Sequence, residues 1–600
     1  KTDGLATTRA QGNPLTTLIQ PAPRIRRMLK RTPSEGFKRA CKSAITITQA
    51  NPPTTLIQPA PRIRRMLKRT PSEGFKRACK SAITITQANP PTTLIQPAPR
   101  DWRMLKRTPS EGSRELPQVF EILITKYLGV SRCSLICMGP QLWPYPTGYT
   151  LYSKKVITLA TRKLDDVIQS VPSEAVGQYL NEVVQLFLRD LASLEVITDG
   201  HSYDSNTLPE LNMFVNIHVE SDPEPRLRLN TEEAYHLKMY TLDDQLMVNL
   251  SSSSFCGVRH GLETLRQMIQ LDQSTGKLIT LSNAEVNDTP SYRYRGLMVD
   301  TARNYISVPD LMRTIDAMAT VKLNTFHWRI SDVTSFPLLL PELPQLFEYG
   351  AYDRAIVYTK EDVRTLVYRA GIRGIRVLIE VAAPGPVGRP WSWSPDATCP
   401  VYNENYTCAN VLCLRLNMKH SIFDTLRTIY AEILEITKVD DIFHLSDGIF
   451  SLSNCLYLIE DREGFLDKAL TILTLANKGF MVKLPVIWYT PHLMKEYEGK
   501  TWNGLGVQMN EVKQDAGDNC LSKFKVIHSA KWDLSCEMKM HRCMKTWQEM
   551  YTWRSWRGVD VLANVGGEAV LWTDLVNSAN LNSYIWPRAA AVAERLWSDD

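Results

Sequence analysis

Residues 295–331, RGLMVDTARNYISVPDLMRTIDAMATVKLNTFHWRIS, decide the fold of this chain. A short apolar run at 295–301 is followed by a helical pattern at 308–322 and by a second apolar run at 323–331. Short, continuous apolar runs are typical of strands that are buried on both faces, and apolar positions at helical spacing are typical of an amphipathic helix. The segment therefore predicts a β-α-β unit.

The same alternation continues to the end of the chain. Further helical patterns, such as 361–374 and 423–437, lie between the apolar runs. The eight apolar runs are 295–301, 323–331, 374–381, 441–447, 484–490, 504–510, 525–530 and 568–574. Eight strand-helix units in about 300 residues are what a (β/α)₈ barrel requires. We therefore expect residues 291–600 to form an α/β domain, a TIM barrel, whose chemistry lies where its strands end.

The region before the barrel, residues 116–290, has a different pattern. Extended segments such as 213–220 and 234–240 alternate with helical stretches at 174–194 and 260–271. This mixture predicts a smaller α+β domain.

Residues 1–115 form a basic leader. The segment 16–53 recurs letter for letter at 54–91, and a third, broken copy starts at Thr92. The leader has 23 Lys and Arg residues against 6 acidic residues, a net charge of +17, so the other 485 residues carry −10 of the total of +7. Because the copies are Pro-rich and lack periodic apolar positions, we expect a disordered leader. Nucleic-acid binding by its arginines is the less favoured interpretation.

The overall composition excludes two classes of protein. Apolar residues make up 44% of the chain and charged residues 22%, which excludes a wholly disordered protein. No stretch contains the roughly 18 uninterrupted apolar residues of a membrane-spanning helix. The chain starts at Lys1, and we see no signal peptide in it.

Several spaced motifs in residues 115–600 resemble the β-N-acetylhexosaminidases of glycoside hydrolase family 20. The insect branch of chitooligosaccharide-degrading β-N-acetylglucosaminidases is the most similar. The motifs are RGLMVDTARNY at 295–305, LNTFHWRISDVTSFP at 323–337, YTKEDV at 358–363, GGEAVLWTDLV at 566–576 and, in the smaller domain, LWPYPTG at 142–148. The resemblance implies the removal of terminal β-linked N-acetylglucosamine from chitooligosaccharides or glycans. It also implies a further helix after AERLWS, so we expect the barrel to be incomplete at its C-terminus.

The resemblance implies a substrate-assisted reaction, in which the acetamide oxygen of the sugar attacks the anomeric carbon. The family's H-x-G-G-D-E motif supplies an aspartate that orients the acetamide and a glutamic acid that protonates the leaving oxygen. Here the segment reads HLSDGIF at 444–450. Asp447 can take the aspartate's place and is our candidate catalytic residue, although it also fits a turn beside Gly448. Because Gly448 or Ile449 stands where the acid belongs, we expect this copy to have lost its catalytic acid.

Other departures from the family pattern point the same way. The third-strand pattern E-F-D-A-P-A-H-x-G-E reads EVAAPGPVGR at 380–389, so that Ala382 and Pro386 replace its aspartate and histidine. Arg329 stands where the family usually has a second histidine. The alternative is therefore a non-catalytic pseudoenzyme that still binds N-acetylglucosamine.

Residues that the resemblance assigns to substrate binding remain in the chain. They are Arg303, Asp332, Trp488, Trp572 and Asp574. An arginine fork suits paired sugar hydroxyls, and a flat aromatic ring stacks on the apolar face of a pyranose. These side chains are therefore the candidate substrate site.

Several of these positions also have a purely structural interpretation. Arg303 could be an ion-pair partner of Asp300 or of Asp332, and Trp488 and Trp572 could be core residues. By the same reasoning His327 and His444 are hydrogen-bonded core histidines, and Glu568 is a buried carboxylate satisfied by backbone amides.

Sequence signals also bear on location and ligands. Three N-glycosylation triplets begin at Asn249, Asn287 and Asn405, and together with the family they favour a secreted or lysosomal glycoprotein. The cysteines outside the leader lack paired C-x-x-C spacing, so we expect no metal site, and we expect no cofactor. A carbohydrate is the expected partner, and a homodimer is left open.

Overall fold

The structure is a computed structural model. It describes residues 130–137, 139–160, 167–195, 210–385, 387–394, 397–400, 414–416, 419–446, 459–489, 504–510, 524–535, 545–554 and 564–599. The basic leader, the candidate catalytic residue Asp447 and its neighbours Gly448 and Ile449 lie outside these residues.

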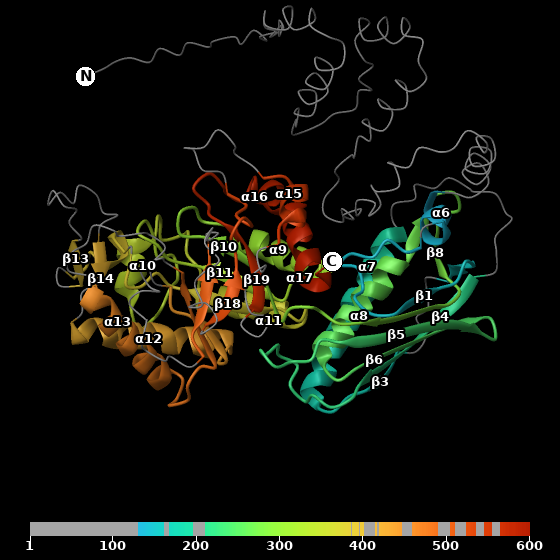
Figure 1. The fold of residues 1–600 in the computed structure, drawn as a ribbon, viewed down its shortest axis with the longest axis horizontal. Coiled ribbons are helices and arrows are strands. Elements are labelled where there is room, and N and C mark those ends of the chain that lie inside the picture. The colour runs from blue at the N-terminus through green and yellow to red at the C-terminus, as the bar shows by residue number, and fades with distance from the viewer. Residues whose placement is uncertain are drawn as a thin grey trace, which may run out of the picture. The chain divides into compact units, whose positions relative to one another are not determined.

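The first domain is built on a mixed sheet of nine strands (Figure 1). In chain order its strands are β1 (Thr150–Tyr152), β2 (Val156–Leu159), β3 (Val167–Ser170), β4 (Glu210–Val219), β5 (Tyr235–Leu242), β6 (Gln245–Ser252), β7 (Gln270–Asp272), β8 (Lys277–Leu281) and β9 (Ala284–Asp288). They lie side by side in the order β1-β9-β5-β6-β4-β2-β8-β7, and β3 pairs with β4. Alternate residues of β4 and β6 are buried, as expected of a sheet covered on one face.

Helices cover that face of the sheet. They are α7 (Glu174–Glu195) and α8 (Phe255–Met268), and a short helix, α6 (Val130–Ile136), precedes the sheet. The Ser254 side chain caps α8 by accepting a hydrogen bond from the amide of Gly257. The helix predicted over 260–271 ends at Met268, because Ile269 is extended and leads into β7. The α+β domain predicted from the sequence is confirmed.

The second domain is the predicted TIM barrel. Its eight strands are β10 (Tyr294–Asp300), β11 (Thr325–Arg329), β12 (Arg376–Glu380), β15 (Ile442–His444), β16 (Leu484–Trp488), β17 (Gly506–Met509), β18 (Lys525–His528) and β19 (Asn564–Leu571). Each overlaps one of the predicted apolar runs. All described pairs of neighbours are parallel, in the order β12-β11-β10-β19-β18-β17-β16-β15. β12 and β15 pack against one another, and among the described residues no ladder joins them.

Helices connect these strands. The described ones are α9 (Val308–Thr320), α10 (Pro344–Gly350), α11 (Lys360–Gly371), α12 (His420–Thr437), α13 (Ile459–Ala476), α15 (Trp547–Thr552), α16 (Leu581–Ile585) and α17 (Arg588–Ser598). A 3₁₀ turn, η2 (Arg389–Trp391), and a small hairpin of β13 (Thr398–Pro400) and β14 (Leu414–Leu416) follow β12. Because helices cover the outside of the strands, all residues of β10, β11 and β12 are buried.

Buried charges join the two domains. Glu233, just before β5, accepts hydrogen bonds from both terminal nitrogens of Arg295 on β10, at 2.9 and 2.6 Å. The imidazole of His260 on α8 lies 2.9 Å from the same carboxylate. Nearby, Lys322 Nζ donates to Asp288 at 3.0 Å. Since isolated buried charges are costly, these pairs hold the base of the barrel against the α+β domain.

None of the helices that the structure describes is long and apolar enough to cross a lipid bilayer.

Candidate functional site

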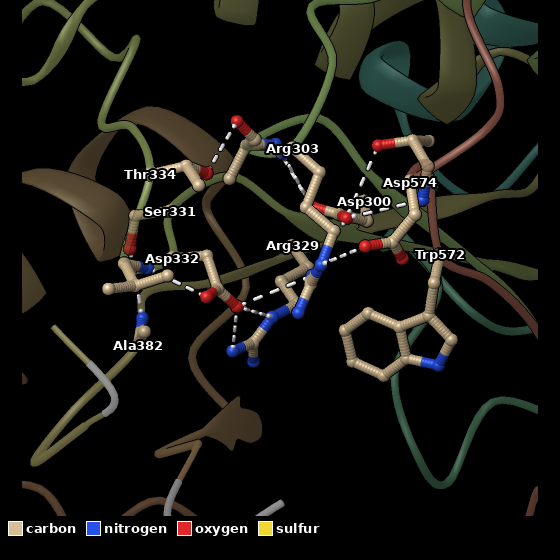
Figure 2. A network of polar contacts seen from close by, with 12 residues as sticks. Asp300, Arg303, Arg329, Ser331, Asp332, Thr334, Ala382, Trp572 and Asp574 are labelled. Atoms are coloured by element: carbon tan, nitrogen blue, oxygen red, sulfur yellow. Dashed lines mark hydrogen bonds and ion pairs between the residues drawn. The ribbon is translucent and has the colours of Figure 1, made fainter. Parts of the chain in front are cut away.

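Charged side chains gather where strands β10, β11 and β19 end (Figure 2). Arg303, three residues after β10, is the centre of the group. Its Nη1 lies 2.9 Å from Asp300 Oδ2 and 3.4 Å from Asp332 Oδ2, and its Nε lies 3.3 Å from Asp574 Oδ1. The structure thus brings together four residues that come from three separate parts of the chain. It also shows the ion pairs of Arg303 with Asp300 and Asp332 that the structural interpretation suggested.

Asp300 fixes the loop that carries Arg303. Its carboxylate is fully buried and accepts hydrogen bonds from the amides of Ala302, at 2.9 Å, and Thr573, at 3.3 Å. The side chain of Asn304 donates to the carbonyl of Thr573 at 2.6 Å. These bonds tie the ends of β10 and β19 together and leave Arg303 little freedom, which is the condition for a preorganised site.

Arg329, the last residue of β11, brings a second guanidinium to the same place. The side chain is 1% exposed. Its Nη2 and Nε donate to Asp332 at 2.7 and 3.2 Å, and its Nη1 donates to Glu380 and, at 3.3 Å, to the hydroxyl of Ser446. Asp332 therefore lies between two arginines, and Arg329 donates four hydrogen bonds to the protein.

Trp572 lies beside both arginines. The guanidinium carbons of Arg303 and Arg329 are 4.9 and 5.3 Å from the centre of its ring, within range of cation–π attraction. Trp488 is fully buried; its ring lies 5.9 Å from that of Trp572 and its indole nitrogen donates to Glu380 at 2.8 Å. In this structure Trp488 thus supports Trp572 from below, while Trp572 is only partly buried.

Beneath this group, a histidine lies between two glutamates. His327 Nε2 is 2.9 Å from Glu380 Oε2, and His327 Nδ1 is 2.9 Å from Glu568 Oε1. Burial opposes a charge on the ring, but the two carboxylates outweigh it and raise the pKa of His327 to about 9. Burial also disfavours the ionised form of Glu380, yet Arg329 and the two histidines hold the pKa of this carboxyl well below its usual range. The core of the barrel therefore contains an imidazolium ion that bridges two carboxylates.

The hydrogen-bond partners of Glu568 differ from those expected from the sequence. It was expected to be satisfied by backbone amides, whereas side chains surround it: His327, the hydroxyl of Tyr294 and, at 2.7 Å, the amide of Gln508. The expectation that His327 and His444 are hydrogen-bonded core residues agrees with the structure. The pairing of Glu380 was not predicted, although two signals pointed to this residue: it is a charged residue at the end of an apolar strand, and it keeps the first glutamate of the third-strand pattern.

The donor atoms of His327, Glu380 and His444 lie within 4.8 Å of one another, close enough to consider a metal ion. Each histidine is already engaged, however. Both nitrogens of His327 face carboxylates, while His444 Nδ1 accepts from the amide of Ser446 at 3.1 Å and His444 Nε2 lies 3.1 Å from Gln508. Burial lowers the pKa of His444 to about 3, so this ring is neutral. We therefore assign the cluster to ion pairing and hydrogen bonding.

Comparison with known proteins agrees with this architecture. The family model "Glycosyl hydrolase family 20, catalytic domain" matches residues 292–448 and 465–600, and the model "beta-acetyl hexosaminidase like" matches residues 142–268. The chitooligosaccharidolytic beta-N-acetylglucosaminidase of Ostrinia furnacalis is 30% identical over 517 residues, which cover 79% of this chain and 84% of that protein. The chain belongs to glycosyl hydrolase family 20.

Two further proteins are similar to this chain. The protein of the same name from Bombyx mori is 34% identical over 410 residues, covering 62% of this chain and 68% of that one. A solved structure, the family 20 exo-beta-N-acetylglucosaminidase of Vibrio harveyi in complex with N-acetylglucosamine, matches with a TM-score of 0.57 at 20% identity, over 76% of this chain and 73% of that chain. This last likeness concerns the fold.

Proposed function

We propose that this family 20 chain holds the terminal β-linked N-acetylglucosamine of a chitooligosaccharide or glycan at the mouth of its barrel, and that its hydrolytic turnover is lost or strongly impaired. A non-catalytic N-acetylglucosamine-binding protein is the limiting form of the same proposal. The insect chitooligosaccharide-degrading branch is the branch that we favour, on the motifs quoted above.

The loss of turnover is supported by one observation: the acidic side chains at the described part of the barrel mouth are paired with arginines. A general acid has to hold a proton at the working pH. Glu380 cannot, because Arg329 keeps the pKa of this carboxyl well below its usual range. Asp300, Asp332 and Asp574 all form ion pairs with Arg303. Each of these four carboxylates thus has a cationic partner, and the sequence lacks the family's glutamic acid at 448–449; together these observations support the loss of turnover.

The sugar-holding part of the proposal assigns a role to each candidate residue. Arg303 would donate to sugar hydroxyls through Nη2, which makes no hydrogen bond among the described residues, whereas Nη1 donates to Asp300. Trp572 would supply the stacking surface, and Asp574, whose side chain is 65% exposed, would accept from a hydroxyl. Asp332 and Trp488 would position Arg303 and Trp572, and Asp447 would contact the acetamide.

Hydrolysis of a chromogenic N-acetylglucosaminide tests the loss of turnover. We expect kcat/KM at least about 10³-fold below that of an active relative assayed in parallel, the range that general acid catalysis supplies. The double variant Gly448→Asp, Ile449→Glu should regain only part of the difference, because Ala382 and Pro386 also replace family residues. Turnover of the unmodified chain near that of the relative would contradict the proposal.

Calorimetric titration with chitobiose tests the sugar site. We expect binding that Arg303→Ala abolishes and that Arg364→Ala leaves unchanged, because Arg364 is half exposed on α11 and its carboxylate partners are 3.8 Å away. Equal affinity of the Arg303→Ala variant and the parent chain would contradict the assignment.

We also propose passage through the secretory route, to the lysosome or the cell exterior. The disulfide between Cys133 and Cys137 supports it, because such bonds persist in oxidising compartments.

A further inference from the structure

The open face of the nine-stranded sheet carries two of the three glycosylation triplets of the sequence. Asn249 lies on β6 and Asn287 on β9, while Asn405 lies outside the described residues. Helices α7 and α8 cover the opposite face, on which Val248 and Val286 are buried. Since successive residues of a strand point to opposite faces, Asn249 and Asn287 share the face that none of the described helices covers.

The surroundings of the two asparagines differ. Asn249 lies in the interior of the sheet, opposite Asn216 on β4 and Lys238 on β5. It is half-buried, and its Oδ1 accepts a hydrogen bond from Asn216 at 2.9 Å. An oligosaccharide attached to Asn249 would have to fit between Asn216 and Lys238 on the two neighbouring strands.

Asn287 is exposed, and its side chain makes no hydrogen bond within the described residues. On one side it lies opposite His236 of β5. On the other its amide donates to the carbonyl of Tyr149 at 2.8 Å, just before the edge strand β1. The Tyr149 side chain is 54% exposed and offers an aromatic surface beside Asn287 against which a first sugar could pack. Thr289, the third residue of the triplet, is also exposed, and its hydrogen bonds with Thr147 involve only the backbone of Thr289.

We propose that Asn287 carries an N-linked oligosaccharide. The donor is an oligosaccharide on a lipid pyrophosphate: the bond between sugar C1 and the pyrophosphate oxygen breaks, a bond between C1 and Asn287 Nδ2 forms, and the amide proton leaves with the pyrophosphate. The glycan lies beside the edge of the sheet, where it hinders β1, whose outer edge is unpaired among the described residues, from pairing with another chain. This modification is independent of the sugar site in the barrel.

Peptide mass spectrometry of the full chain tests the proposal. Residues 1–600 are expressed behind a cleavable secretion signal in insect cells, and the protein from the medium is treated with a peptide N-glycosidase in heavy-oxygen water, which converts each glycosylated asparagine into labelled aspartate. We expect the label at Asn287 in most molecules. Asn287→Gln and Thr289→Ala should each abolish it, and Thr289→Ser, which keeps the triplet, should retain it.

Unlabelled Asn287 in the secreted protein would overturn the proposal, as would label confined to Asn249 or Asn405. Because the hydrogen bonds of Thr289 with Thr147 use its backbone, Thr289→Ala and Thr289→Ser both keep them, so a difference between the two variants reports on the triplet rather than on folding.

Discussion

Raising the pH above neutrality should lower the stability of the fold, because the His327 ring at the centre of the barrel then loses its proton. The His327 ring is a cation between Glu380 and Glu568, at 2.9 Å from each. Its pKa is raised from 6.5 to about 9. Loss of the proton leaves two buried carboxylates facing a neutral ring, which is a costly arrangement in a low-dielectric core.

The size of the effect follows from the pKa. A difference of about 2.5 between the pKa of His327 in the folded and unfolded states corresponds to ~3 kcal/mol, since each unit is worth ~1.4 kcal/mol. Because the folded-state pKa is the higher one, the contribution is complete below pH 6.5. It declines as the pH rises from 6.5 towards 9 and is absent above pH 9.

Urea unfolding followed by tryptophan fluorescence measures this loss, and the comparison is with His327→Gln, which cannot titrate in this range. Between pH 6.5 and pH 9 the parent chain should lose ~3 kcal/mol more free energy of unfolding than the variant. If both proteins lose free energy in parallel, His327 is not a cation at neutral pH, and the reasoning about the barrel core fails.

Three further predictions concern stability. Glu233→Gln should lower the free energy of unfolding by about 3–5 kcal/mol, because it leaves the buried charge of Arg295 unmatched. The control Glu285→Gln, at the surface, should leave the Tm unchanged. Equal Tm values for the two variants would contradict the role of Glu233. Ser254→Ala should cost ~1 kcal/mol in urea unfolding through loss of the α8 cap, and no change would show that the cap is dispensable. Burial lowers the pKa of His528 to about 4, so this residue costs stability as the pH falls from 6.5 to 4. In thermal denaturation, the Tm of His528→Gln should therefore fall less steeply with decreasing pH than the Tm of the parent chain. An equal slope for the two proteins would refute this.

The barrel could be predicted from the sequence because its strands are buried on both faces. Strands such as β10 and β12 read as continuous apolar runs, and the interval between runs is long enough for a helix. Both ends of α8 were misplaced: the helix begins at Phe255 rather than at 260, and it ends at Met268 because the extended backbone of Ile269 leads into β7.

The site could be predicted only in part. The resemblance identified Arg303, Asp332, Trp572 and Asp574, and the structure brings these four together. It could not identify Glu380 as the partner of Arg329, because their pairing depends on the register of β11 with β12, which places the two residues side by side. Such contacts between distant segments leave no periodic signal in either strand.

β12 and β15 are joined by no ladder within the described part of the barrel, and this has a consequence for how the barrel moves. The other neighbouring strands of the barrel are joined by hydrogen-bond ladders. Local opening should therefore begin between β12 and β15, where no described ladder hydrogen bond has to break. Glu380 and His444 stand on opposite sides of this joint, 3.7 Å apart. Breathing motions of the barrel would therefore converge on the charged cluster, so amide hydrogen exchange at 376–380 and 442–444 should respond to an occupant of the mouth earlier than exchange in β10 or β19.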